Sequence, residues 1–140
     1  MKNLLLVAVG GACGASARYG VGIIASRLFG SGFPWGTLIV NGGGCFVMGI
    51  VGQMLLNLEA QPAAVSLADG ATPQFNFVAL RHLVAIGFLG GLTTFSAFGW
   101  DTVRELETGR LGSALANIGA NVLLGLLAVW AGVSLVRALS

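Results

Sequence analysis

Four apolar stretches account for most of the 140 residues, and each is long enough to cross the hydrocarbon core of a bilayer as a helix. They cover residues 4–29, 34–58, 77–100 and 111–139. Only 9% of the residues are charged and 56% are hydrophobic, which leaves too few polar side chains to cover a soluble globule of this size. The sequence therefore predicts an all-α integral membrane protein with one four-helix domain over residues 1–140.

One long connection remains between the second and third stretches, over residues 59–76. It is rich in alanine, proline and polar residues, a composition typical of segments that bury little apolar surface. We expect this connection to be poorly ordered or peripheral to the helices.

The third stretch contains a glycine pair followed by small hydroxyl residues, Gly90-Gly91-Leu92-Thr93-Thr94-Phe95-Ser96-Ala97-Phe98. Glycine and β-branched threonine both weaken a helix. In lipid, a freed N–H or C=O group needs a partner, so an unwound turn persists only where it is buried in protein or lines a polar path. The pattern predicts a third helix that is broken within the membrane, beside an ion or substrate site.

The basic residues near the span ends divide evenly between the two sides of the membrane. Four spans place Lys2, Arg81 and Arg137 on one side, and on the other side they place Arg27, Arg104 and Arg110. The side richer in Lys and Arg normally stays in the cytoplasm. An even distribution therefore predicts insertion in both orientations and pairing with an inverted copy, with an ordinary parallel dimer as the alternative.

Two pairs of glycines recur at four-residue spacing, Gly10 with Gly14 and Gly87 with Gly91. Such pairs let helix backbones approach closely in a membrane. We interpret them as support for an oligomer whose form they do not specify.

Arg18 is the one charged residue that falls clearly inside a predicted span. A charge at membrane depth is costly, so it is a functional candidate by default. The alternative is that Arg18 extends to the interface and anchors its helix. Because Arg27 already supplies an anchor nearer that end, we favour a functional role.

The carboxylates fall at predicted span ends or in connections, so a proton-coupled carrier and an acid–base enzyme are both disfavoured. The polar residues inside the spans are neutral: Thr37, Asn41, Thr93, Thr94, Ser96, Asn117 and Asn121. Neutral donors suit the passage of an ion that exchanges its water for weak partners. For Asn117 and Asn121, which share one helix face, interhelical hydrogen bonding is an equal alternative.

Phe95 and Phe98 are three residues apart and share one helix face directly after the predicted break. Aromatic ring edges carry partial positive charge and could contact an anion. From spacing alone, apolar filling of a lipid-facing surface is the better interpretation.

Three glycine-rich motifs follow one another along the first three spans. The first is Gly10-Gly11-Ala12-Cys13-Gly14-Ala15-Ser16-Ala17-Arg18-Tyr19, and the second is Pro34-Trp35-Gly36-Thr37-Leu38-Ile39-Val40-Asn41-Gly42-Gly43-Gly44-Cys45-Phe46. The third and most specific is Gly87-Phe88-Leu89-Gly90-Gly91-Leu92-Thr93-Thr94-Phe95-Ser96-Ala97-Phe98. Together they resemble the Fluc/CrcB family of fluoride channels, whose second motif reads P-x-G-T-L-x-x-N-x-x-G-x-F, over almost the whole chain.

The resemblance implies a passive channel that exports fluoride from the cytoplasm across the cell inner (plasma) membrane and thereby lowers its toxicity. It also implies an antiparallel, dual-topology homodimer with two pores. The backbone carbonyls of Gly90 and Thr93 from both protomers would hold a structural Na⁺ at the dimer centre.

By motif match, Arg18 lies in the vestibule and the fluoride path is lined by Asn41, Phe95, Phe98, Ser96 and Thr37. Asn117 and Asn121 stand where many members have Tyr and Ser, so they preserve a polar lining from the fourth helix while changing its detail. The resemblance thus turns the two phenylalanines from filler into candidate anion contacts.

A small coupled membrane transporter is the main alternative to a passive channel. The two differ in whether flux requires a proton or cation gradient. A structural protein whose glycines serve packing alone is the third reading, and it leaves the predicted helix break unexplained.

Overall fold

The computed structural model describes residues 1–60 and 73–140, and the regular structure of these residues is entirely helical. Four helices are long and apolar enough to cross a membrane: Lys2–Phe29, Trp35–Glu59, Phe77–Glu107 and Leu111–Leu139. The predicted all-α architecture with four spans is confirmed, and the chain is a multi-pass membrane protein.

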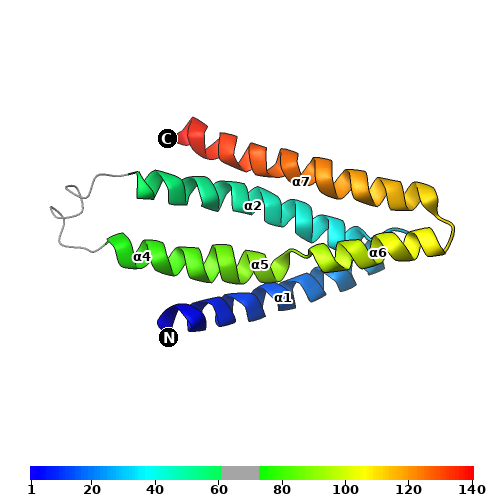
Figure 1. Cartoon of the computed structure of the whole chain (residues 1–140), viewed down its shortest axis with the longest axis horizontal. Helices are drawn as coiled ribbons and strands as arrows, with labels where there is room; N and C mark the ends of the chain where they lie inside the picture. Colours follow the sequence, from blue (N-terminus) through cyan, green and yellow to red (C-terminus); the bar gives the residue numbers. More distant parts are fainter. Residues whose placement is uncertain (61–72) are drawn as a thin grey trace.

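Successive crossings are antiparallel, and both termini lie at the same end of the bundle (Figure 1). The first two crossings are α1 (Lys2–Phe29) and α2 (Trp35–Glu59). The third is assembled from α4 (Pro73–Leu80), the π-helix η1 (Arg81–Leu89), α5 (Gly90–Leu92) and α6 (Phe95–Glu107), and the last is α7 (Leu111–Leu139).

The connection over residues 59–76 is shorter than the composition indicated. Glu59 still belongs to α2, and Pro73 already begins α4. Residues 61–72, and with them most of our expectation for this connection, lie outside the described part of the chain.

The third crossing extends further than its apolar stretch. α6 continues past Trp100 to Glu107, so Asp101 and Glu105 lie on the helix rather than beyond it. The Glu105 side chain is only 2% exposed, and Arg110 donates to both of its carboxylate oxygens, at 2.8 Å from Nε and 2.7 Å from Nη2. A paired carboxylate can be carried on a buried helix face, which hydropathy alone does not anticipate.

The turn between α6 and α7 is a Schellman motif. Gly109 adopts a left-handed conformation with φ of 75°, which favours glycine. The N–H groups of Gly109 and Arg110 donate to the carbonyls of Leu106 and Glu105 at 3.0 and 2.9 Å. This tight turn makes α6 and α7 antiparallel, so positions equally far on either side of it lie side by side.

Glycines bring α1 into close contact with the third crossing. A Cβ atom on Gly10 would overlap the carbonyl of Leu83, and one on Gly14 would overlap the carbonyl of Phe88. A Cβ atom on Gly87 would lie 3.0 Å from the Cα of Gly10. The glycine pairs therefore meet within one protomer, and their interpretation as oligomer contacts is wrong, because this packing within the chain already uses the space they create.

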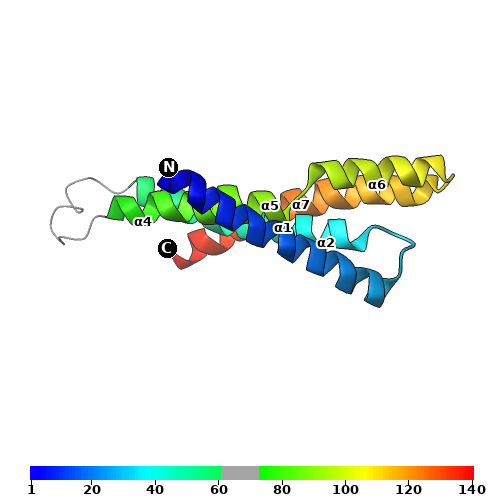
Figure 2. The same ribbon diagram turned by 90° about the horizontal axis from the view of Figure 1, so that it is seen from below.

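Glycines also set the contact between α2 and α7. A Cβ atom on Gly49 would overlap the carbonyl of Val129, and one on Gly132 would overlap the carbonyl of Phe46. At the end opposite the termini, α6 and α7 separate from α1 and α2 (Figure 2). The α1–α2 hairpin and the α6–α7 hairpin are therefore apart at that end.

We expect Gly49→Val to lower the thermal midpoint of the detergent-solubilised protein, because the new side chain has to push α7 away. Overpacking of this kind costs roughly 1–3 kcal/mol. Gly52→Val on the same helix is the matched control, since a Cβ atom there meets nothing within 4 Å. Equal midpoints for the two variants would contradict this account of the α2–α7 contact.

Candidate functional site

The third crossing is interrupted at Thr93 and Thr94. Thr93 has φ and ψ of −79° and 156°, and Thr94 has −153° and 119°, so both residues are extended. The Thr94 hydroxyl accepts a hydrogen bond from the Ala97 N–H at 3.1 Å and thereby caps the start of α6. The helix break predicted from the glycine and threonine run lies here.

Asn41 on α2 pairs with the extended backbone at two points. Its Oδ1 accepts from the Thr94 N–H at 2.8 Å, and its Nδ2 donates to the Thr94 carbonyl at 3.2 Å. A side-chain amide thus replaces the backbone partners that the interrupted helix no longer supplies, which is what an apolar environment demands of a buried peptide group. Thr94 is accordingly buried, with 8% exposure.

The break redirects two N–H groups away from carbonyls upstream. In an uninterrupted helix the Thr94 N–H would donate to Gly90, but it donates to Asn41. The Ala97 N–H would similarly donate to Thr93, but it donates to the Thr94 hydroxyl. The carbonyls of Gly90 and Thr93 are therefore released from their regular helical partners.

A chain of hydrogen bonds continues from Asn41 through α7 and back to α6. Asn41 Nδ2 donates to Asn121 Oδ1 at 2.9 Å, and Asn121 Nδ2 donates to Asn117 Oδ1 at 2.9 Å. Asn117 Nδ2 donates to the Thr102 hydroxyl at 2.8 Å, which in turn donates to the Phe98 carbonyl at 2.8 Å. Every donor in this amide chain points the same way, so its bonds reinforce one another.

The two asparagines of α7 have different surroundings. Asn117 is fully buried at 0% exposure, between Asn121 and Thr102. Asn121 contacts Asn41 and lines a cavity. Both asparagines therefore take part in interhelical hydrogen bonds, and Asn121 in addition lines a cavity.

A first cavity, of about 340 Å³, lies beside the break and is named here the phenylalanine cavity. Its walls include Asn41, Thr94, Phe95, Phe98 and Asn121, and it also touches Gly90 and Thr93. The two rings are 5.4 Å apart between centroids and inclined at 52°. The Phe95 side chain is 84% exposed.

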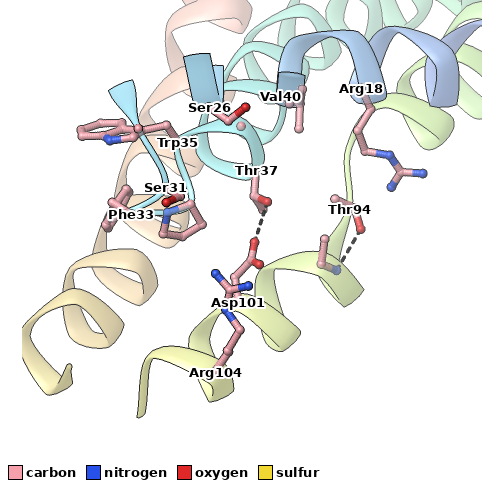
Figure 3. A pocket seen from close by; sticks show the side chains of 15 residues that line it. Arg18, Ser26, Ser31, Phe33, Trp35, Thr37, Val40, Thr94, Asp101 and Arg104 are labelled. Carbon is pink, nitrogen blue, oxygen red and sulfur yellow. Dashed lines mark hydrogen bonds between the residues drawn. The ribbon is translucent and has the colours of Figure 1, made fainter. Parts of the chain in front are cut away.

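A second cavity, of about 270 Å³, lies between the separated hairpins and is named here the arginine cavity. Its polar walls include Arg18 from α1, Thr37 from α2, and Thr94, Asp101 and Arg104 from the third crossing (Figure 3). The Thr37 hydroxyl donates to Asp101 Oδ2 at 2.7 Å. Two guanidinium groups against one carboxylate give this cavity a net positive charge, which favours anions.

Thr94 lines both cavities, so the break lies between them. Ser96 belongs to the exposed side of the same turn, and its hydroxyl lies 3.2 Å from the Thr94 hydroxyl. The structure thus gathers Asn41, Thr94, Phe95, Phe98 and Asn121 at one cavity, Arg18 and Thr37 at the other, and Ser96 next to their junction.

Asp101 and Thr102 are part of this region, although the sequence predicts Asp101 at a span end and does not single out Thr102. The apolar stretch ends at Trp100 whereas α6 continues to Glu107, so hydropathy places both residues outside the span. A signal existed for Thr102: a turn at Gly109 and Arg110 places it at the same distance from the turn as Asn117. For Asp101 the signal was its position three residues beyond Phe98, on the same helix face.

We expect Asn117→Leu to destabilise the protein, because it leaves the Thr102 hydroxyl without its donor and shortens the amide chain. An unmet buried polar group costs about 1–3 kcal/mol, which thermal unfolding in detergent would report. Asn57→Leu is the control: it also removes an asparagine bonded between α2 and α7, at the exposed end of the bundle. If Asn117→Leu were as stable as the unmodified protein, the interpretation of Asn117 as a structural link would fail.

Comparison with known proteins matches residues 5–133 to the family described as CrcB-like protein, Camphor Resistance (CrcB). A protein of Rhizobium etli named fluoride-specific ion channel FluC is 45% identical over 140 residues, covering 99% of each chain. Proteins of the same name are 44% identical in Rhizobium johnstonii, with 100% of each chain covered, and 40% identical in Dehalococcoides mccartyi, with 94% of this chain and 90% of that protein covered. Because the family model and these relatives match almost the whole chain, this chain belongs to the CrcB family.

Proposed function

We propose that this protein is a fluoride-selective passive channel that exports cytoplasmic fluoride across the plasma membrane and so lowers its toxicity. The observation that carries the proposal is the junction of two cavities at a buried, polar helix break, Thr94 with Asn41. The full-length similarity to proteins named as fluoride-specific channels supports the choice of ion. The function is transport and not catalysis.

Selectivity for fluoride requires replacing a tightly held hydration shell in small steps. A wide positive pore would favour larger, more weakly hydrated anions, so the path has to be narrow and lined by donors. In our proposal Arg18 raises the local anion concentration in the arginine cavity. The ion then passes polar groups of Thr37, Asn41 and Ser96.

The phenylalanine cavity supplies the next contacts. The edges of Phe95 and Phe98 carry partial positive charge and accept an anion more readily than aliphatic side chains do. Their tilted arrangement, at 52°, presents edges in different directions. Asn121 adds a polar group from α7 to the same wall, and Asn117 would contribute through Asn121.

The proposed channel is an antiparallel homodimer of oppositely inserted protomers. Support comes from the even distribution of basic residues. Lys2 begins α1 and Arg137 lies in the last turn of α7 at one end, while Arg27 lies in the last turn of α1 and Arg110 precedes α7 at the other. The exposed ring of Phe95 at the mouth of a cavity is a surface that a second protomer would cover. Cysteine cross-linking between opposite ends of two protomers tests this arrangement.

A structural Na⁺ at the dimer centre is part of the proposal. The released carbonyls of Gly90 and Thr93 are oxygen ligands of the kind that hard cations prefer, and nothing lies within 4 Å of a Cβ position on Gly90. The cation would balance the carbonyl dipoles where two breaks meet. Replacing Na⁺ by a large organic cation during purification is expected to lower the thermal midpoint.

A small coupled transporter is the second candidate, and Asp101 is the observation in its favour. Its carboxylate faces Thr37 in the arginine cavity, where a proton carrier would need a titratable group. This observation does not exclude a channel, because a hydrogen bond between Thr37 and Asp101 is equally expected in a channel wall.

The deciding experiment is anion efflux from liposomes that contain the purified protein and are loaded with fluoride or chloride. Valinomycin is added to release the voltage, and an ion-selective electrode follows the efflux. Fast fluoride loss with little chloride loss and no need for a pH gradient is expected of the channel. Flux that requires a proton gradient and disappears in Asp101→Asn would favour the transporter, and no flux from folded protein would exclude both.

We expect Asn41→Asp to reduce fluoride efflux by about tenfold or more, because it removes both amide donors and adds a negative charge to the path. The loss of one hydrogen bond to an ion corresponds to such a factor. Phe95→Ile is expected to lower efflux in the same assay through the loss of its ring edge.

Phe29→Ile makes the same exchange at a ring that is 56% exposed at the end of α1, and it serves as the control for Phe95. Unchanged efflux in both Asn41→Asp and Phe95→Ile would show that the ion takes another route.

A further inference from the structure

The side-chain amide of Asn41 has no N–H group to spare. It carries two donors, of which one binds the Thr94 carbonyl at 3.2 Å and the other binds Asn121 Oδ1 at 2.9 Å. An anion contacts Asn41 through an N–H group, so it has to displace one of these two acceptors. The two acceptors, the Thr94 carbonyl and Asn121 Oδ1, differ in how readily an anion can displace them.

The orientation of both amides is determined by a backbone group. The Thr94 N–H can only donate, so the Asn41 atom that faces it at 2.8 Å is the oxygen, and Asn41 Nδ2 is turned toward Asn121. Asn121 must then present its oxygen to Asn41 and its nitrogen to Asn117, as it does at 2.9 Å. Rotating either amide by half a turn would bring two donors or two acceptors together.

The Asn121 oxygen is the acceptor that can leave. The bond from Asn41 to the Thr94 carbonyl is half of a two-point pair with the backbone, so breaking it disturbs the helix break itself. Asn121 contributes only a side chain, and both it and Asn41 line the phenylalanine cavity, where the contact is open to an arriving ion.

We propose that the side-chain carbonyl oxygen of Asn121 competes with fluoride for Asn41 Nδ2. This oxygen accepts the hydrogen bond from Asn41 Nδ2 when no ion is present, and an arriving fluoride ion displaces it. This inference rests on the proposed channel function and assigns Asn121 as a residue that tunes fluoride affinity. It acts through Asn41 and is a positioning residue rather than an obligatory fluoride contact.

Asn41 Nδ2 has a hydrogen-bond acceptor both when the ion is bound and after it has left. Hydrogen bonds to an anion are roughly twice as strong as bonds between neutral groups, so fluoride can displace an amide oxygen. When the ion leaves, Asn121 returns, and Asn41 avoids the cost of an unmet buried donor. A built-in competitor therefore lowers net affinity, which conduction requires because the ion has to leave as readily as it enters.

The test is the dependence of single-channel conductance on symmetric fluoride concentration in planar bilayers. Asn121→Ala is expected to lower the half-saturating fluoride concentration by roughly threefold to tenfold, the factor that one neutral hydrogen bond supplies. Asn121→Asp places a charged acceptor against Asn41 and is expected to raise that concentration or abolish conduction.

Asn57→Ala is the matched control for the loss of an asparagine side chain. It removes an amide that donates to the Ser140 hydroxyl at the C-terminal end of α7, outside the amide chain of Asn41, and should keep the wild-type half-saturating concentration. If Asn57→Ala shifted it as much as Asn121→Ala, or if Asn121→Ala left it unchanged or raised it, competition by Asn121 would be excluded. An unmodified protein that conducts no fluoride would instead refute the channel itself.

A second measurement on the unmodified protein does not depend on the variants folding. With asparagine side chains labelled with ¹⁵N, fluoride titration is expected to shift the Asn41 and Asn121 amide signals together, while chloride leaves both in place. A fluoride response of Asn41 with no response of Asn121 would overturn the proposal.

Discussion

The structure depends on how one interrupted turn satisfies its backbone in a medium without water. Two extended residues, Thr93 and Thr94, expose peptide groups that an unbroken helix would pair internally. The Asn41 side chain binds both the N–H and the carbonyl of Thr94, and the Thr94 hydroxyl caps the helix that follows. The backbone groups of Thr94 at the break are therefore hydrogen-bonded, and these bonds link α2 to the third crossing at the point where its helix is interrupted.

Two kinds of packing surround this pair. Glycine contacts hold α1 against η1 and α2 against α7 so closely that side chains are excluded, which fixes the helix positions without polar groups. The amide chain through Asn121, Asn117 and Thr102 adds direction, because each amide nitrogen donates to an oxygen of the next residue in the chain. At the end opposite the termini these contacts act within each hairpin but do not join the two, and the hairpins separate and leave the arginine cavity between them.

Much of this organisation could be predicted from local sequence. The spans follow from hydropathy, and the break follows from weak helix formers in an apolar stretch. Two predictions failed for a common reason. The glycine pairs appeared available for another protomer, and the third span appeared to end at Trp100. Gly87 packs against α1, and Glu105 pairs with Arg110. Hydropathy evaluates each residue separately and therefore does not register either contact.

Local sequence is enough to predict that the chain crosses the membrane four times, that its third crossing is broken, and that neutral polar residues accompany the break. Those properties depend on composition and on neighbouring residues. Helix packing, by contrast, is needed to establish that Asn41 binds Thr94, that Asn117 is buried while Asn121 lines a cavity, and that Asp101 accepts a hydrogen bond from Thr37. The physical reason is that a hydrogen bond of a few ångströms depends on which helix faces meet, and the close glycine packing of the bundle sets those faces.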